Sequence, residues 1–128
     1  MTFPNANSGI YFHTKYQEAS WPAAGFECQV NNTYEKDPRK TASLYAVKDV
    51  KEPLVKDNEW FLYEIVVQGR KVEIKINGKT ANTYEAAADY QPPKGMAGRV
   101  LGTGTFALQG HDKGSKVMFR NIAVKPLE

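Results

Sequence analysis

The chain of 128 residues carries 17 basic and 14 acidic side chains, a net charge of +3 and a single cysteine. This length suits one domain, residues 1–128, with a core of useful size. The small charge and the scattered Lys and Arg residues exclude a basic nucleic-acid-binding stripe, and one cysteine excludes an internal disulfide. No stretch has the length and apolar character of a membrane span, and no signal-peptide h-region follows Met1.

Apolar and polar residues alternate with a period of two in the first part of the chain, which indicates β-strands. Residues 8–15 form the first expected strand and residues 25–32 the second. In the second strand, the two faces separate apolar from polar side chains: Phe26, Cys28 and Val30 against Glu27, Gln29 and Asn31. A row of carboxylate and carboxamide groups can hydrogen-bond to sugar hydroxyls, although the solvent-exposed face of an ordinary antiparallel sheet has a similar pattern. Cys28 is expected to be a buried small apolar residue.

Further expected strands follow along the chain: residues 41–47, 60–68, 71–77, 79–84, 106–111 and 116–125. Gly69-Arg70 and Asn77-Gly78 predict tight hairpin turns between three of them. In the last strand the apolar phase shifts, which indicates a bulge near Arg120-Asn121. Because no amphipathic helix is apparent, we expect an all-β fold, an antiparallel β-sandwich with long loops.

Six short motifs, spread from residue 7 to residue 122, resemble those of one family. In chain order they are Asn7-Ser8-Gly9-Ile10-Tyr11-Phe12, Gly25-Phe26-Glu27-Cys28-Gln29-Val30, Thr41-Ala42-Ser43-Leu44-Tyr45, Trp60 with Tyr63-Glu64-Ile65-Val66, Gly104-Thr105-Phe106-Ala107-Leu108-Gln109-Gly110-His111, and Phe119-Arg120-Asn121-Ile122. Together they resemble the 3-keto-disaccharide hydrolase domain, the domain of unknown function 1080. The resemblance implies a concanavalin A-like jelly roll, a carbohydrate ligand, and a periplasmic or secreted location.

The residues fit the chemistry that this resemblance implies. Classical glycosidases need two carboxylates that flank the bond, and the chain has Glu27 on a suitable strand but no E-x-D-x-x-E run. The ketone of a 3-keto sugar makes the C2 proton acidic, so one base, one acid and hydrogen-bond donors suffice for elimination, with water added afterwards. We expect Glu27 and His111 to be catalytic, with Gln29 and Gln109 binding the substrate.

Other side chains are expected to line a sugar-binding groove: Tyr11, His13, Asn31 and Tyr45. Tyr45 offers an aromatic face to a pyranose ring. His111 also fits a plain loop histidine, and Arg120 is expected to pair with a carboxylate or a carbonyl. Trp60 is expected in the core. The spacing of Glu27, His13 and His111 is no metal signature, and no cofactor is identified.

Two other functions remain open. A non-catalytic carbohydrate-binding module would use the same polar face without turnover, and an incomplete domain would serve assembly. Members of the family carry further strands before the Asn-Ser-Gly-Ile motif and usually an Arg in place of His13, whereas this chain begins almost at that motif. We therefore expect a sandwich that lacks these N-terminal strands, with an open sheet edge that pairs with a second copy in a homodimer or a strand-exchanged assembly. The alternative is that the strands present already close a smaller sandwich.

Overall fold

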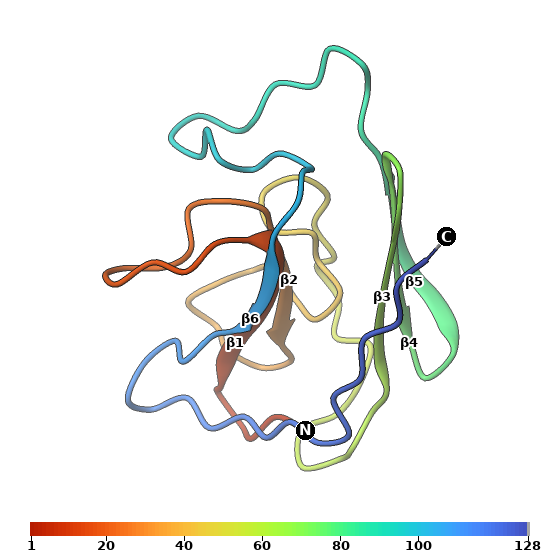
Figure 1. Cartoon of the computed structure of the whole chain (residues 1–128). Coiled ribbons are helices and arrows are strands. Elements are labelled where there is room, and N and C mark those ends of the chain that lie inside the picture. The colour runs from red at the N-terminus through yellow and green to blue at the C-terminus, as the bar shows by residue number, and fades with distance from the viewer. Residues whose placement is uncertain (128) are drawn as a thin grey trace.

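The computed structural model describes residues 1–127, and within that range the chain forms strands and loops but no helix (Figure 1). The strands are β1 (Asn7–Thr14), β2 (Phe26–Asn31), β3 (Tyr63–Gln68), β4 (Lys71–Ile76), β5 (Lys79–Glu85) and β6 (Thr105–Leu108). They form two antiparallel sheets with the strand orders β2-β1-β6 and β3-β4-β5. The predicted all-β sandwich is confirmed. No helix in residues 1–127 could cross a membrane.

The first sheet has β1 at its centre, with Gly9 opposite Gln29 and Tyr11 opposite Glu27 across the ladder to β2. The predicted strand at residues 41–47 is wrong, because Ala42 and Ala46 adopt positive φ angles of 76° and 59° that interrupt the extended chain. The segment nevertheless lies beside β2 and exchanges backbone hydrogen bonds with it. It therefore supports the outer side of β2 without forming a regular strand.

The second sheet consists of the two predicted hairpins. Gly69 and Gly78 adopt positive φ angles of 57° and 76°, which tight hairpin turns require. The first strand of this sheet begins at Tyr63, not at residue 60. Trp60 therefore lies outside the ladder with 39% of its surface exposed, and the prediction of a core position is wrong.

One buried apolar cluster joins the two sheets. Its members come from β1, β2, β4 and the segment beside β2: Phe12, Phe26, Cys28, Ala42, Leu44, Val72, Ile74 and Ile76. Cys28 is fully buried as predicted, and this burial raises the pKa of its thiol.

The C-terminal segment differs from the prediction. Residues 116–125 form no strand, and only Val117 makes a bridge, to Thr2. Asn121 has a φ of 54°. The shift of the apolar pattern near this residue therefore marks a change in the direction of the backbone, and the predicted bulge in a strand ladder is wrong. Arg120 makes no ion pair and no side-chain hydrogen bond to a carbonyl in residues 1–127, which contradicts the prediction. Its guanidinium lies 3.9 Å from the Trp60 ring centroid.

Candidate functional site

The candidate site is a buried polar cluster on the first sheet, and three predicted site residues meet there. Tyr11 on β1 lies directly opposite Glu27 on β2, and its hydroxyl donates a hydrogen bond of 2.8 Å to Glu27 Oε2. Gln109, one residue after β6, donates from Nε2 to the Tyr11 hydroxyl oxygen at 3.1 Å. A chain of hydrogen bonds therefore crosses the sheet and ends on the carboxylate.

Arg99 completes this cluster, and the sequence analysis did not identify it. Its Nη2 lies 3.5 Å from Glu27 Oε2, and its Nη1 donates to the carbonyl of Gly25 at 3.1 Å. Arg99 is 2% exposed and belongs to the long loop between β5 and β6, which arches over the first sheet (Figure 1). Because this loop has no periodic pattern, the only sequence signal is a lone Arg between Gly98 and apolar residues.

The two oxygens of Glu27 have different surroundings. Oε2 takes the contacts from Tyr11 and Arg99, whereas Oε1 makes no hydrogen bond within residues 1–127. The carboxyl lies against the backbone of Gly9. A Cβ at Gly9 would overlap with Oε1 and would stand 2.8 Å from Glu27 Cγ. The glycine of the first motif is therefore required by the position of Glu27.

Glu27 has the electrostatics of a group that can exchange a proton. Burial raises the pKa of its carboxyl above the usual 4.5, and the Tyr11 hydrogen bond and the Arg99 charge oppose this rise. The charges of Asp37 and His111 are also close enough to act on it, in opposite directions. Burial and the neighbouring Glu27 charge raise the pKa of Tyr11. Perturbed carboxyl groups of this kind are typical of acid–base sites.

His111 forms a dyad with its neighbour in the chain. Its Nδ1 lies 2.6 Å from Asp112 Oδ2, and Asp112 is held in turn by the hydroxyl of Ser115 at 2.7 Å. These contacts hold the pKa of Asp112 well below its usual range. Because Nδ1 is engaged, Nε2 is the ring nitrogen left to act on a ligand.

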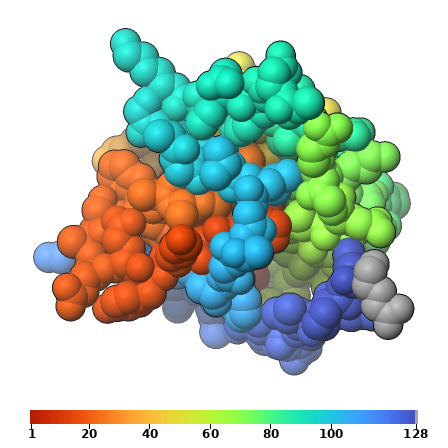
Figure 2. All heavy atoms as spheres, turned by 45° about the horizontal axis from the view of Figure 1, so that its top comes forward, coloured from red at the N-terminus to blue at the C-terminus, as the bar shows by residue number. Residues whose placement is uncertain are grey.

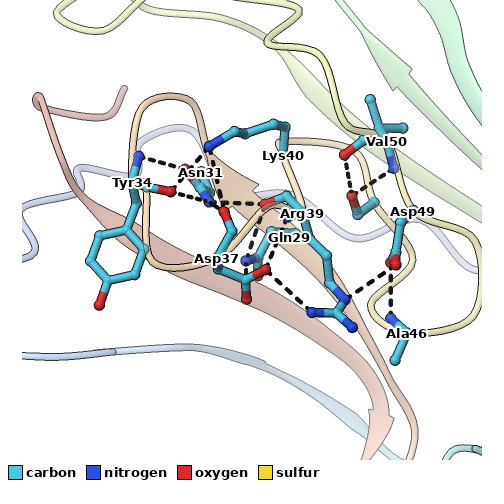
Figure 3. Close-up of polar contacts among 10 residues, drawn as sticks. Gln29, Asn31, Tyr34, Asp37, Arg39, Lys40, Ala46, Asp49 and Val50 are labelled. Atoms are coloured by element: carbon cyan, nitrogen blue, oxygen red, sulfur yellow. Dashed lines mark hydrogen bonds and ion pairs between the residues drawn. The ribbon is translucent and has the colours of Figure 1, made fainter.

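Gln29 and Asn31 hold a loop, residues 32–40, against β2 (Figure 3). Asn31 Nδ2 donates to the carbonyls of Tyr34, Asp37 and Arg39 at 3.3, 3.1 and 2.9 Å. Gln29 Nε2 makes longer contacts of 3.5 Å with Asp37 Oδ2 and the Arg39 carbonyl. Both side chains are buried, and their carboxamide groups bind the loop.

Two further predicted residues are separate from the Glu27 hydrogen-bond chain. One face of Tyr45 is covered by the guanidinium of Arg39, 4.4 Å from the ring centroid. Figure 3 shows Arg39 between Asp37 and Asp49, at 3.3 and 3.2 Å. His13 has a φ of 53° at an irregularity in the β1–β6 pairing. Its Nδ1 accepts a hydrogen bond from the Gly102 amide.

No group of three or more His, Cys, Asp or Glu side chains gathers as a metal site anywhere in residues 1–127. The set of Glu27, His13 and His111 accordingly does not converge in the structure.

A second feature is a groove of about 1020 Å³ between β1, β3, β6 and the C-terminal segment. Figure 2 shows the segments that border it: the cyan segment with β6, the green hairpin with β3, and the dark blue C-terminal segment. Of twelve exposed large apolar side chains in the described chain, eight line this groove: Trp60, Leu62, Phe106, Leu108, Met118, Ile122, Val124 and Leu127. The apolar residues of β6 thus face an open groove instead of a closed core.

A family described as the 3-keto-alpha-glucoside-1,2-lyase-like domain matches residues 1–125. The chain belongs to this 3-keto-disaccharide hydrolase domain family. The membership predicted from the six motifs is therefore confirmed. No curated protein and no solved structure matches the chain significantly.

Three of the family motifs meet at Glu27. The first motif supplies Gly9 and Tyr11, the second supplies Glu27 itself, and the fifth supplies Gln109. His111 of the fifth motif makes no hydrogen bond to Glu27 within residues 1–127; its ring contacts Asp112 and Tyr34. The residues of this 3-keto-disaccharide hydrolase domain that lie far apart in sequence thus gather around one carboxyl group.

Proposed function

We propose that this domain cleaves 3-keto-glycosides by elimination, followed by addition of water, with Glu27 as the base. The environment of Glu27 is the observation that best supports this proposal. Oε2 is held by Tyr11 and Arg99, and Oε1 makes no hydrogen bond within residues 1–127. A fixed carboxyl group with a pKa raised by burial is suited to accept a proton near neutral pH.

The reaction balances with one base and one acid. Glu27 Oε1 takes the proton from C2, which the neighbouring ketone makes acidic, and the electron pair forms the C1–C2 double bond through the enolate. The C1–O bond breaks, and His111 Nε2 gives a proton to the leaving oxygen. Water then adds across the double bond, with its oxygen at C1 and a proton at C2, to give the free 3-keto sugar.

Arg99 supports the negative charge that develops in this reaction, and Gln109 is placed to bind a substrate hydroxyl. Arg99 stabilises the carboxylate before proton transfer and offers positive charge beside the enolate afterwards. The Nε of Arg99 and the Oε1 of Gln109 are buried and have no partner in the described chain. Arg99 Nε can donate to a substrate oxygen, and Gln109 Oε1 can accept from a substrate hydroxyl. Tyr11 positions Glu27 through its hydrogen bond.

An unoxidised glucoside is a poor substrate under this proposal. Its C2 proton is not acidic, and Asp37, the carboxylate whose charge acts on Glu27, is engaged by Arg39 and the side chain of Gln29. Direct hydrolysis needs two free carboxylates across the bond. We therefore expect cleavage to require prior oxidation at C3.

The direct test is incubation with a 3-keto disaccharide, with the released sugars quantified. The expected result is cleavage by the parent chain and a loss of about 10²-fold or more in Glu27→Gln. Glu85→Gln is the matched control, since Glu85 is exposed on β5 in the other sheet. Equal rates for Glu27→Gln and the parent would show that Glu27 is not the base.

A carbohydrate-binding module is the second candidate, and one observation favours it. The Glu27 side chain is 6% exposed and paired with Arg99, which also suits a structural ion pair. Under this alternative, a 3-keto disaccharide binds to the parent chain without product. Binding calorimetry and product analysis on the same sample separate the two functions. We also propose a periplasmic or secreted location, on the basis of family membership.

A further inference from the structure

We propose that the groove between β3 and β6 is the interface to a second copy of this chain, which packs with its own groove face about a two-fold axis. Glu27 does not line the groove, whereas Tyr11, which holds Glu27, does. The inference rests on the exposed apolar side chains and the charges of the groove, not on the catalytic proposal.

The groove exposes two sheet edges. β3 ends one sheet and β6 ends the other, so one side of each strand has no neighbouring strand in the described chain. Residues 119–127 run along the groove, but their backbone makes no hydrogen bond with β3 or β6. Unpaired strand edges beside apolar side chains favour association.

The apolar content of the groove face is unusual for a free surface. Phe106 and Met118 are 46% and 44% exposed, and Ile122 and Val124 are 58% and 70% exposed. Large contiguous apolar patches on soluble proteins mark interaction sites. The chain's own C-terminal segment already forms one wall and leaves about 1020 Å³ open. Another molecule is therefore needed to cover this face.

The charges on the groove face identify the second copy as that molecule. Glu64 on β3 and both Arg120 and Lys125 on the C-terminal segment line the same groove. None of these three residues makes an ion pair within residues 1–127. A two-fold interface must be self-complementary, and a surface with unpaired charges of both signs meets this requirement. Glu64 of one copy then faces the basic residues of the other.

Sedimentation at micromolar concentration tests the proposal. We expect the parent chain to be a dimer, and Glu64→Lys and Lys125→Glu each to weaken the dimer by about tenfold or more, since like charges then face each other. The double variant Glu64→Lys/Lys125→Glu restores association, because the opposite charges are exchanged. Lys79→Glu, on the far edge strand β5, is the control and leaves the dimer intact.

Val124→Asp adds a readout that does not depend on ion pairs. This side chain is 70% exposed, so its replacement leaves the fold unchanged by circular dichroism and yields a monomer. A monomeric parent chain with a cooperative melt overturns the proposal. It is equally overturned by charge reversals that leave the dimer unchanged, or by association that continues beyond two copies.

Discussion

Gly9 and Glu27 lie against each other across the β1–β2 ladder so closely that no side chain fits at residue 9. The Glu27 carboxyl therefore packs directly against the backbone of β1. Tyr11, two residues along the same strand, donates a hydrogen bond to Glu27 Oε2. A single strand thus fixes the position of the proposed base and supplies the hydrogen bond that partly opposes the rise of its pKa by burial.

Replacement of Gly9 by alanine should damage the site more than the fold. The added Cβ overlaps with the Glu27 carboxyl, so the carboxyl moves away and breaks its bond to Tyr11. We expect turnover of a 3-keto disaccharide to fall and the free energy of unfolding to drop by about 1–3 kcal/mol. Urea unfolding and product assays measure both. Gly102→Ala is the control, since a Cβ at Gly102 meets nothing within 4 Å.

Replacement of Tyr11 by phenylalanine should move the pH profile of activity. The Tyr11 hydrogen bond lowers the pKa of Glu27, so its loss raises that pKa further. A base acts only when it is ionised, and the acidic limb of kcat/KM therefore shifts to higher pH in Tyr11→Phe. Tyr16→Phe, at an 87% exposed position, keeps the parent profile. An unshifted limb in Tyr11→Phe contradicts the assignment of that limb to Glu27.

Replacement of Asn31 by alanine should release residues 32–40 from β2. The change removes the Asn31 hydrogen bonds to three carbonyls and leaves the Tyr34 amide unpaired, at a cost of about 1–3 kcal/mol. The contacts of Lys40 Nζ and Gln29 Nε2 with these carbonyls remain. We expect faster tryptic cleavage after Lys36 or Arg39 under native conditions. Glu35→Ala, at an exposed position in the same loop, should be cleaved like the parent. Equal cleavage of all three proteins would mean that Asn31 does not hold the loop.

Cys28 should resist thiol reagents while the chain is folded. The residue is fully buried, and burial raises the pKa of its thiol, so the reactive thiolate is scarce. Labelling is expected to be complete in denaturant and to follow the rate of unfolding without it. Rapid labelling of the folded chain would show that the core around Cys28 opens locally.

Much of the second sheet could be predicted from sequence because its determinants are local. Asn77-Gly78 specifies a tight turn, and the alternation of Val72, Ile74 and Ile76 specifies one buried face. In the first sheet, the alternation of side chains along the strands likewise indicates which residues share a face, and Tyr11, Glu27 and Gln109 meet in one cluster.

The remaining features depend on contacts between distant segments. Single residues with positive φ, such as Ala42 and Asn121, end regular strand geometry where the apolar pattern continues. Arg99 reaches Glu27 from a loop 72 positions away in sequence, which no spacing rule indicates. Gln29 and Asn31 alternate along β2 as expected of a strand, but only the fold shows that their carboxamide groups bind residues 32–40.

The central claim is that Glu27 removes the proton from C2, and cleavage in D2O tests it most directly. A 3-keto disaccharide is incubated with the parent chain, with Glu27→Gln and without protein, and the released 3-keto sugar is analysed by proton NMR at early times. Elimination followed by addition of water predicts deuterium at C2 in the product of the parent chain, above the level of spontaneous exchange in the other two samples. A product that keeps its original C2 proton would contradict the account, because the bond would then have been cleaved by direct hydrolysis.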